Sequence, residues 1–141
     1  MNKEFIENML KSYKNLFNTE LALNIESLVN ANYVCAAHKF YADSSPRFIF
    51  ANQQALNLWQ LSLEEFIGMP STKTASEEHQ QERDSLLNQV HSQGFIKNYS
   101  GIRQTSTGQN FKIFDALVWN VYNEKQETIG QAVKFDNYKM L

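Results

Sequence analysis

The last third of the chain holds the feature that most constrains the fold: three strand-like segments separated by short turn signals. The segments are residues 95–105, 109–122 and 128–135, and the turns between them are Ser106-Thr107-Gly108 and Asn123-Glu124-Lys125. Turn-forming residues between apolar runs are typical of antiparallel hairpins. We therefore predict a three-stranded antiparallel meander in this part of the chain.

Upstream of the meander, helical and strand-like patterns alternate. Apolar residues recur every three or four positions over residues 3–17, which predicts an amphipathic helix. Two short strands follow at residues 33–38 and 47–51, then several short helices. A longer helix is expected to begin at Ser76 and to end at Gly94. Two early strands and three late ones, with helices between them, predict an α+β sheet with helices on one face.

Composition narrows the classes of function. The chain has 141 residues, enough for one domain that folds without a disulfide or a metal. Its net charge of −2 comes from dispersed charges of both signs, so we expect no nucleic-acid partner. Cys35 is the only cysteine, which excludes an internal disulfide. No apolar run approaches the roughly 20 residues that span a bilayer, so we expect no membrane partner and a cytoplasmic location.

Short motifs spread from residue 50 to residue 120 connect this chain to a known family. They are Phe50-Ala51-Asn52-Gln53-Gln54-Ala55-Leu56 with Trp59 and Leu61, Ile67-Gly68-Met69-Pro70-Ser71, Gly94-Phe95-Ile96, Tyr99-Ser100-Gly101-Ile102-Arg103, Ser106-Thr107-Gly108, Phe111 with Ile113, and Asp115-Ala116 leading to Val118-Trp119-Asn120. In these segments the chain resembles the MEKHLA domain, a family related to PAS sensor domains. This domain occurs at the end of plant homeodomain-leucine-zipper proteins and alone in bacteria, and the chain resembles the standalone bacterial form.

The resemblance implies a fold and a role. The fold would be α+β, a PAS-like five-stranded antiparallel sheet with helices on one face and an additional N-terminal amphipathic helix. Residues 1–30 would form an N-terminal helical segment, and residues 31–141 the PAS-like MEKHLA domain. The implied role is sensing or binding, with no established reaction.

The middle strand of the meander is apolar on both faces. Under strict alternation one face carries Phe111, Ile113, Asp115, Leu117 and Trp119, and the other carries Lys112, Phe114, Ala116, Val118, Asn120 and Tyr122. Apolar residues on the second face need a cover, and the helix predicted over residues 3–17 can supply it from the same chain or from a second copy. We therefore expect either a helix-capped sheet or a homodimer that forms through this helix or the outer sheet face.

Asp115 and His38 are the two polar residues whose predicted positions need an explanation. A carboxylate between Ile113 and Leu117 on an apolar face is costly unless it is hydrogen-bonded or paired. Asp115 could pair with Arg103 or Tyr99, or it could point into a ligand cavity. His38 ends the first strand and could bond a ligand or Asp115, although a lone histidine there is more often satisfied locally or solvent-facing.

The leading hypothesis is a PAS-like module that binds a small, partly apolar or aromatic ligand between the helices and the inner sheet face. It would signal through dimerisation or a partner protein. The expected ligand contacts are His38, Tyr99, Asp115 and Trp119. No catalytic, metal or phosphate-loop motif is present, and we expect no haem or flavin adduct, hence no cofactor. The alternatives are a cofactor-independent isomerase or lyase using His38 and Asp115, and a purely structural or interaction domain.

Overall fold

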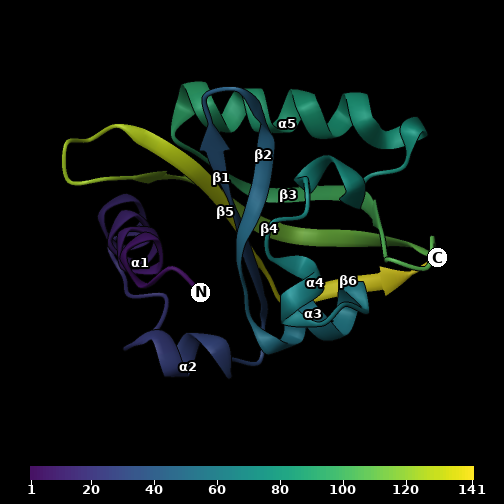
Figure 1. The fold of residues 1–141 in the computed structure, drawn as a ribbon, viewed down its shortest axis with the longest axis horizontal. Helices are drawn as coiled ribbons and strands as arrows, with labels where there is room; N and C mark the ends of the chain where they lie inside the picture. Colours follow the sequence, from purple (N-terminus) through teal and green to yellow (C-terminus); the bar gives the residue numbers. More distant parts are fainter.

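The computed structural model describes residues 1–141 and has the α+β architecture predicted from the sequence (Figure 1). Its elements in chain order are α1 (Lys3–Phe17), α2 (Ile25–Val29), β1 (Val34–Tyr41), β2 (Ser44–Ala51), α3 (Gln53–Trp59), α4 (Leu63–Phe66), the short 3-10 helices η1 (Ser71–Thr74) and η2 (Glu77–His79), α5 (Gln80–Gln93), β3 (Phe95–Gln104), β4 (Asn110–Tyr122), β5 (Thr128–Phe135) and β6 (Asn137–Met140). None of the helices combines the length and apolarity needed to cross a bilayer.

The strands form one antiparallel sheet in the order β2-β1-β5-β4-β3. A sixth strand, β6, was not predicted; it pairs with the first half of β4, beyond the end of β5. Helix α1 lies on one side of the sheet, and helices α3 and α4 lie on the opposite side (Figure 1). Leu86 and Val90 of α5 pack on Val118, on the same side of the sheet as α3 and α4. We call the side that faces α3, α4 and α5 the inner face, and the side that faces α1 the outer face.

Helix α1 covers the outer face from within the same chain. It begins where the Asn2 side chain accepts a hydrogen bond from the Phe5 amide (3.0 Å), and it ends at Asn18 in the left-handed conformation. The buried side chains of its apolar stripe are Phe5, Ile6, Met9 and Tyr13, which pack on the outer sheet residues. Of the two expectations for this helix, the structure therefore shows the helix-capped sheet. The apolar stripe needs no second chain to bury it.

A bulge in β4 changes which residues share a face. Tyr99 is opposite Ala116 and Gly101 is opposite Ile113, so β4 has one more residue than β3 between these pairs. Asp115 takes up the extra residue with a φ of 52°. The predicted alternation is therefore wrong after Ile113. The inner face carries Phe111, Ile113, Ala116, Val118 and Asn120, and the outer face carries Leu117, Trp119 and Val121.

The start of α5 also differs from the prediction, whereas its end agrees. Ser76 makes no side-chain capping bond; the 3-10 helix η2 follows it, and α5 begins only at Gln80. At the other end Gly94 has a φ of 93°, and its amide donates to the Val90 carbonyl. Glycine adopts this backbone conformation without the steric cost that other residues incur.

Candidate functional site

A cavity of about 80 Å³ lies between the inner face of the sheet and the segment from η1 to α5. Its apolar walls include Phe48, Trp59, Leu86, Ile113, Val118 and Val133. Its polar wall consists of side chains from five elements of the chain, namely His38, Ser71, Thr74, Arg83, Tyr99, Arg103 and Gln131. The site is therefore amphiphilic, with cationic and hydrogen-bonding groups as well as hydrocarbon in its lining.

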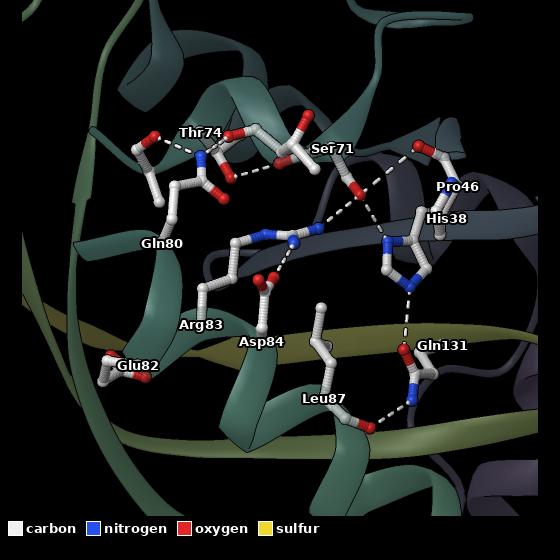
Figure 2. Close-up of polar contacts among 12 residues, drawn as sticks. His38, Pro46, Ser71, Thr74, Gln80, Glu82, Arg83, Asp84, Leu87 and Gln131 are labelled. Carbon is white, nitrogen blue, oxygen red and sulfur yellow. Dashed lines mark hydrogen bonds and ion pairs between the residues drawn. The ribbon is translucent and has the colours of Figure 1, made fainter. Parts of the chain in front are cut away.

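His38 lies at the centre of a buried hydrogen-bond chain (Figure 2). It is 5 % exposed on β1. Its Nδ1 lies 2.7 Å from the Ser71 Oγ, and its Nε2 lies 2.8 Å from the Gln131 Oε1. The Gln131 Nε2 donates to the Leu87 carbonyl of α5 (3.0 Å) and contacts the Asn120 Oδ1 (3.4 Å). This chain joins β1, β4 and β5 to α5.

The partners of His38 determine its tautomer. Because the Gln131 amide nitrogen donates to Leu87, its Oε1 is the acceptor, and the His38 Nε2 must carry the proton. The His38 Nδ1 then accepts from the Ser71 hydroxyl, whose oxygen in turn accepts from Arg83 (2.6 Å). Burial, with a smaller contribution from the Arg83 charge, lowers the pKa of His38 to about 4. His38 is thus neutral at pH 7.

Two arginines contribute positive charge to the lining of the cavity. Arg83 on α5 is 5 % exposed and donates to Ser71 and to Asp84 (3.1 Å). Arg103 on β3 is 7 % exposed and donates to the Glu82 carboxylate (3.2 Å) and to its neighbour's carbonyl (2.8 Å). Burial and the charge of Arg103 lower the pKa of Arg83 from its usual value. Both cations are buried, whereas their carboxylate partners remain accessible to solvent.

Tyr99 and Gly101 hold Arg103 in place. The Tyr99 hydroxyl donates to the Glu82 carboxylate (2.5 and 2.6 Å) and accepts from Arg103 (3.0 Å). Burial raises the pKa of Tyr99, so the hydroxyl keeps its proton. A Cβ atom at Gly101 would overlap the Tyr99 hydroxyl and lie 2.5 Å from the Glu82 Oε1. Gly101 is therefore the residue that makes room for this three-residue cluster.

Two of the four predicted ligand contacts line the cavity, and the other two do not. His38 and Tyr99 line the cavity. Asp115 does not, because the bulge turns it out to solvent, and Arg103 pairs with Glu82 instead. Trp119 lies on the outer face, where its Nε1 donates to the Met9 carbonyl (3.3 Å) and its ring contacts that of Tyr13. The predicted positions of Asp115 and Trp119 are thus wrong for one reason, the extra residue in β4.

Ser71, Arg83 and Gln131 were not predicted as site residues. Arg83 precedes the buried Leu86 by three residues and Val90 by seven, so it occupies the apolar stripe of α5. A charged residue in that apolar stripe was the sequence signal that could have identified Arg83 as a site residue. Gln131 shares the inner face of β5 with Val133, and a polar residue on a largely apolar strand face was a weaker signal. Nothing in the local sequence marks Ser71, since only the tertiary fold brings it to His38.

Comparison with known proteins gives one family and a set of structural neighbours. The MEKHLA domain family matches residues 3–140, a range that includes α1 and α2. The PAS domain of a protein from Colwellia psychrerythraea has a TM-score of 0.67 at 16 % identity, over 79 % of this chain and 92 % of that chain. A light-oxygen-voltage domain studied with a flavin analogue has a TM-score of 0.64 at 11 % identity, over 83 % of each chain.

An RNA-binding light-oxygen-voltage receptor has a TM-score of 0.65 at 13 % identity, over 77 % of this chain and 30 % of that chain. The comparison with curated proteins gives no match. At these identities the structural likeness establishes the fold and nothing beyond it.

Proposed function

This chain belongs to the MEKHLA domain family and has the PAS fold, and from that premise we propose that it is a sensory module that binds a small molecule. The observation that carries the proposal is the amphiphilic cavity beneath α5. Buried polar side chains from β1, β3, β5, η1 and α5 converge on it. A protein interior that serves only as a core is usually filled by apolar side chains in close contact.

The size of the cavity limits the ligand. Sites for drug-sized molecules enclose roughly 300–1,000 Å³, and a water molecule occupies about 30 Å³ of liquid. The cavity of about 80 Å³ is well below the range for drug-sized molecules. A ring system as large as a flavin does not fit between these walls. The ligand that we propose is a compound of a few non-hydrogen atoms.

Binding is better supported than catalysis. The isomerase or lyase alternative required His38 and Asp115 in one site, but only His38 lines the cavity. General bases work best when their pKa is near the operating pH. The pKa of His38, lowered to about 4, makes it a weak base at neutral pH. We therefore propose that His38 orders the wall of the cavity through Ser71 and Gln131.

The hydrogen-bond chain offers a way for ligand binding in the cavity to change the position of α5, which lies at the surface. Gln131 on β5 bonds the backbone of α5, and Asn120 on β4 donates to the His91 carbonyl near the end of that helix (3.1 Å). A ligand that displaces Ser71 or Arg83 would therefore change how α5 is held on the sheet. We propose that dimerisation or a partner protein responds to this change.

Native mass spectrometry of the purified protein tests the proposal, because it reports bound small molecules and the number of chains together. We expect a species heavier than the chain by the mass of a small ligand. The variant Val133→Phe, which fills the cavity, should lose the added mass, whereas Val29→Phe, a matched change in α2 away from the cavity, should keep it. No added mass, together with no thermal stabilisation by any member of a panel of small polar and apolar compounds, would contradict the proposal.

A further inference from the structure

The lining of the cavity contains more unpaired hydrogen-bond donors than free acceptors. A guanidinium group has five N–H donors, and the bonds of Arg83 to Ser71 and Asp84 account for two of them. Trp59, which also lines the cavity, has the only buried side-chain polar atom without a partner, its Nε1 donor. An unpaired buried donor costs about 1–3 kcal/mol, so an acceptor that reached it would be stabilising.

Most acceptors in the lining of the cavity are already engaged, the exception being the Thr74 hydroxyl oxygen, which donates to the Ser71 carbonyl and accepts no bond. The Ser71 oxygen accepts from Arg83, and the Gln131 Oε1 accepts from His38. The Tyr99 oxygen accepts from Arg103, and His38 offers only Nδ1, which takes the Ser71 proton. A cationic or donor-rich ligand would meet two buried arginines, whose carboxylate partners Asp84 and Glu82 lie toward solvent, and few free acceptors. A group with acceptors only and a negative charge has the opposite, favourable balance.

The apolar part of the lining selects against a purely inorganic anion. Leu86, Val118 and Val133 belong to it, and these side chains would be left facing a fully hydrated ion. A carboxylate with a short alkyl tail satisfies both kinds of lining, since planar carboxylates accept paired hydrogen bonds from guanidinium groups. The volume available leaves room for only a few carbon atoms.

We propose that the cavity binds a short-chain monocarboxylate of about two to four carbons, with its carboxylate on Arg83 and Arg103 and its alkyl tail against Leu86, Val118 and Val133. This inference rests on the proposed small-molecule function and adds the ligand class. Tyr99, Glu82 and Gly101 are positioning residues, because they orient Arg103 and are not required to contact the ligand.

Calorimetric titration of the full chain with propionate tests the inference, with propionamide and nitrate as comparison ligands at equal ionic strength. We expect saturable binding of propionate and at least tenfold weaker binding of both comparison ligands. Arg83→Gln should weaken propionate binding at least tenfold. Arg83→Lys keeps the charge but loses the paired geometry, so its affinity for propionate should lie between those of the unmodified chain and Arg83→Gln. Arg47→Gln, a change of an exposed arginine that does not line the cavity, should bind like the unmodified chain. Near-UV circular dichroism verifies that each variant is folded.

The outcomes separate this inference from the function on which it rests. Equal binding of propionate and propionamide, or unchanged propionate binding by folded Arg83→Gln, overturns the carboxylate assignment but leaves a small-molecule site. Nitrate binding as tightly as propionate overturns it in favour of a general anion site. If no small compound binds, and Val133→Phe changes nothing, both the inference and the proposed function fail.

Discussion

At the residue scale, Asn52 is the most heavily used polar side chain outside the cavity. It is fully buried, and its Oδ1 accepts from the amides of Cys35 (3.0 Å) and Ala55 (3.1 Å). Its Nδ2 donates to the carbonyls of Leu28 (3.3 Å) and Tyr33 (2.8 Å). One side chain thus caps α3 and ties it to α2 and β1. The family motif over residues 50–56 has a structural explanation at this position.

Asn52→Ala removes all four bonds and leaves buried backbone groups unpaired. We expect the free energy of unfolding to fall by about 2–4 kcal/mol, combining a lost helix cap with unsatisfied partners. Urea denaturation measures the change. Asn57→Ala, at an exposed position in the same helix, should cost less than about 0.5 kcal/mol. Equal stability of the two variants would contradict the role given to Asn52.

His38 should make stability depend on pH. Its pKa is about 4 in the folded chain and 6.5 in the unfolded chain, so the unfolded state binds the extra proton as the pH falls. The contribution of neutral His38 is fully present above pH 6.5 and is lost as the pH falls toward 4. We expect a loss of about 2 kcal/mol between pH 7 and pH 5 in urea denaturation. His38→Gln should lose this pH dependence, whereas His91→Gln, at an exposed histidine, should retain it. The same pH profile in both variants and the unmodified chain would contradict this role of His38.

The presence of an aspartate at position 115 is explained by its backbone conformation rather than by its carboxylate. A residue with a φ of 52° is in the left-handed region, which aspartate and asparagine tolerate and β-branched residues do not. Asp115→Asn should therefore leave stability within about 0.5 kcal/mol, and Asp115→Val should cost about 1–2 kcal/mol. Thermal denaturation distinguishes them. A costly Asp115→Asn together with a harmless Asp115→Val would mean that the carboxylate, not the bulge, matters.

At the element scale, α1 is the cover of the outer face. Met9 is fully buried between the helix and the sheet, so Met9→Ala should lower the free energy of unfolding by about 2–5 kcal/mol. Lys11→Ala, on the exposed side of the same helix, is the matched control. Because the helix packs on its own chain, the protein should stay folded when it is diluted to a single chain. Loss of the folded state on that dilution would instead indicate that α1 is exchanged between two chains.

The elements that could be predicted from sequence are those with strong local signals. The helix over residues 3–17 has a wide apolar stripe, and the meander has turn residues at both loops. Strand β6 could not be predicted, because its four residues are all exposed and show no alternation. The bulge at Asp115 could not be predicted either. It contains no glycine to signal a left-handed residue, and it reverses every later side chain in β4.

At the scale of the whole molecule, the site is an assembly of distant residues. His38, Ser71, Arg83 and Gln131 come from β1, η1, α5 and β5, and His38 and Gln131 are 93 positions apart. Local patterns identified His38 and Tyr99 as polar residues near the inner face. They could not identify the partners, because hydrogen bonds of this range depend on the sheet order that brings β1 beside β5.

We propose above that the cavity beneath α5 admits a small ligand beside Arg83 and Arg103. The most direct measurement is a two-dimensional ¹H–¹⁵N NMR titration of the full chain with propionate. We expect saturable shifts at the amides of Ser71, Arg83, Tyr99 and Arg103, with the outer-face residues of α1 unchanged. Shifts that do not saturate, or that occur only at exposed lysines, would contradict it.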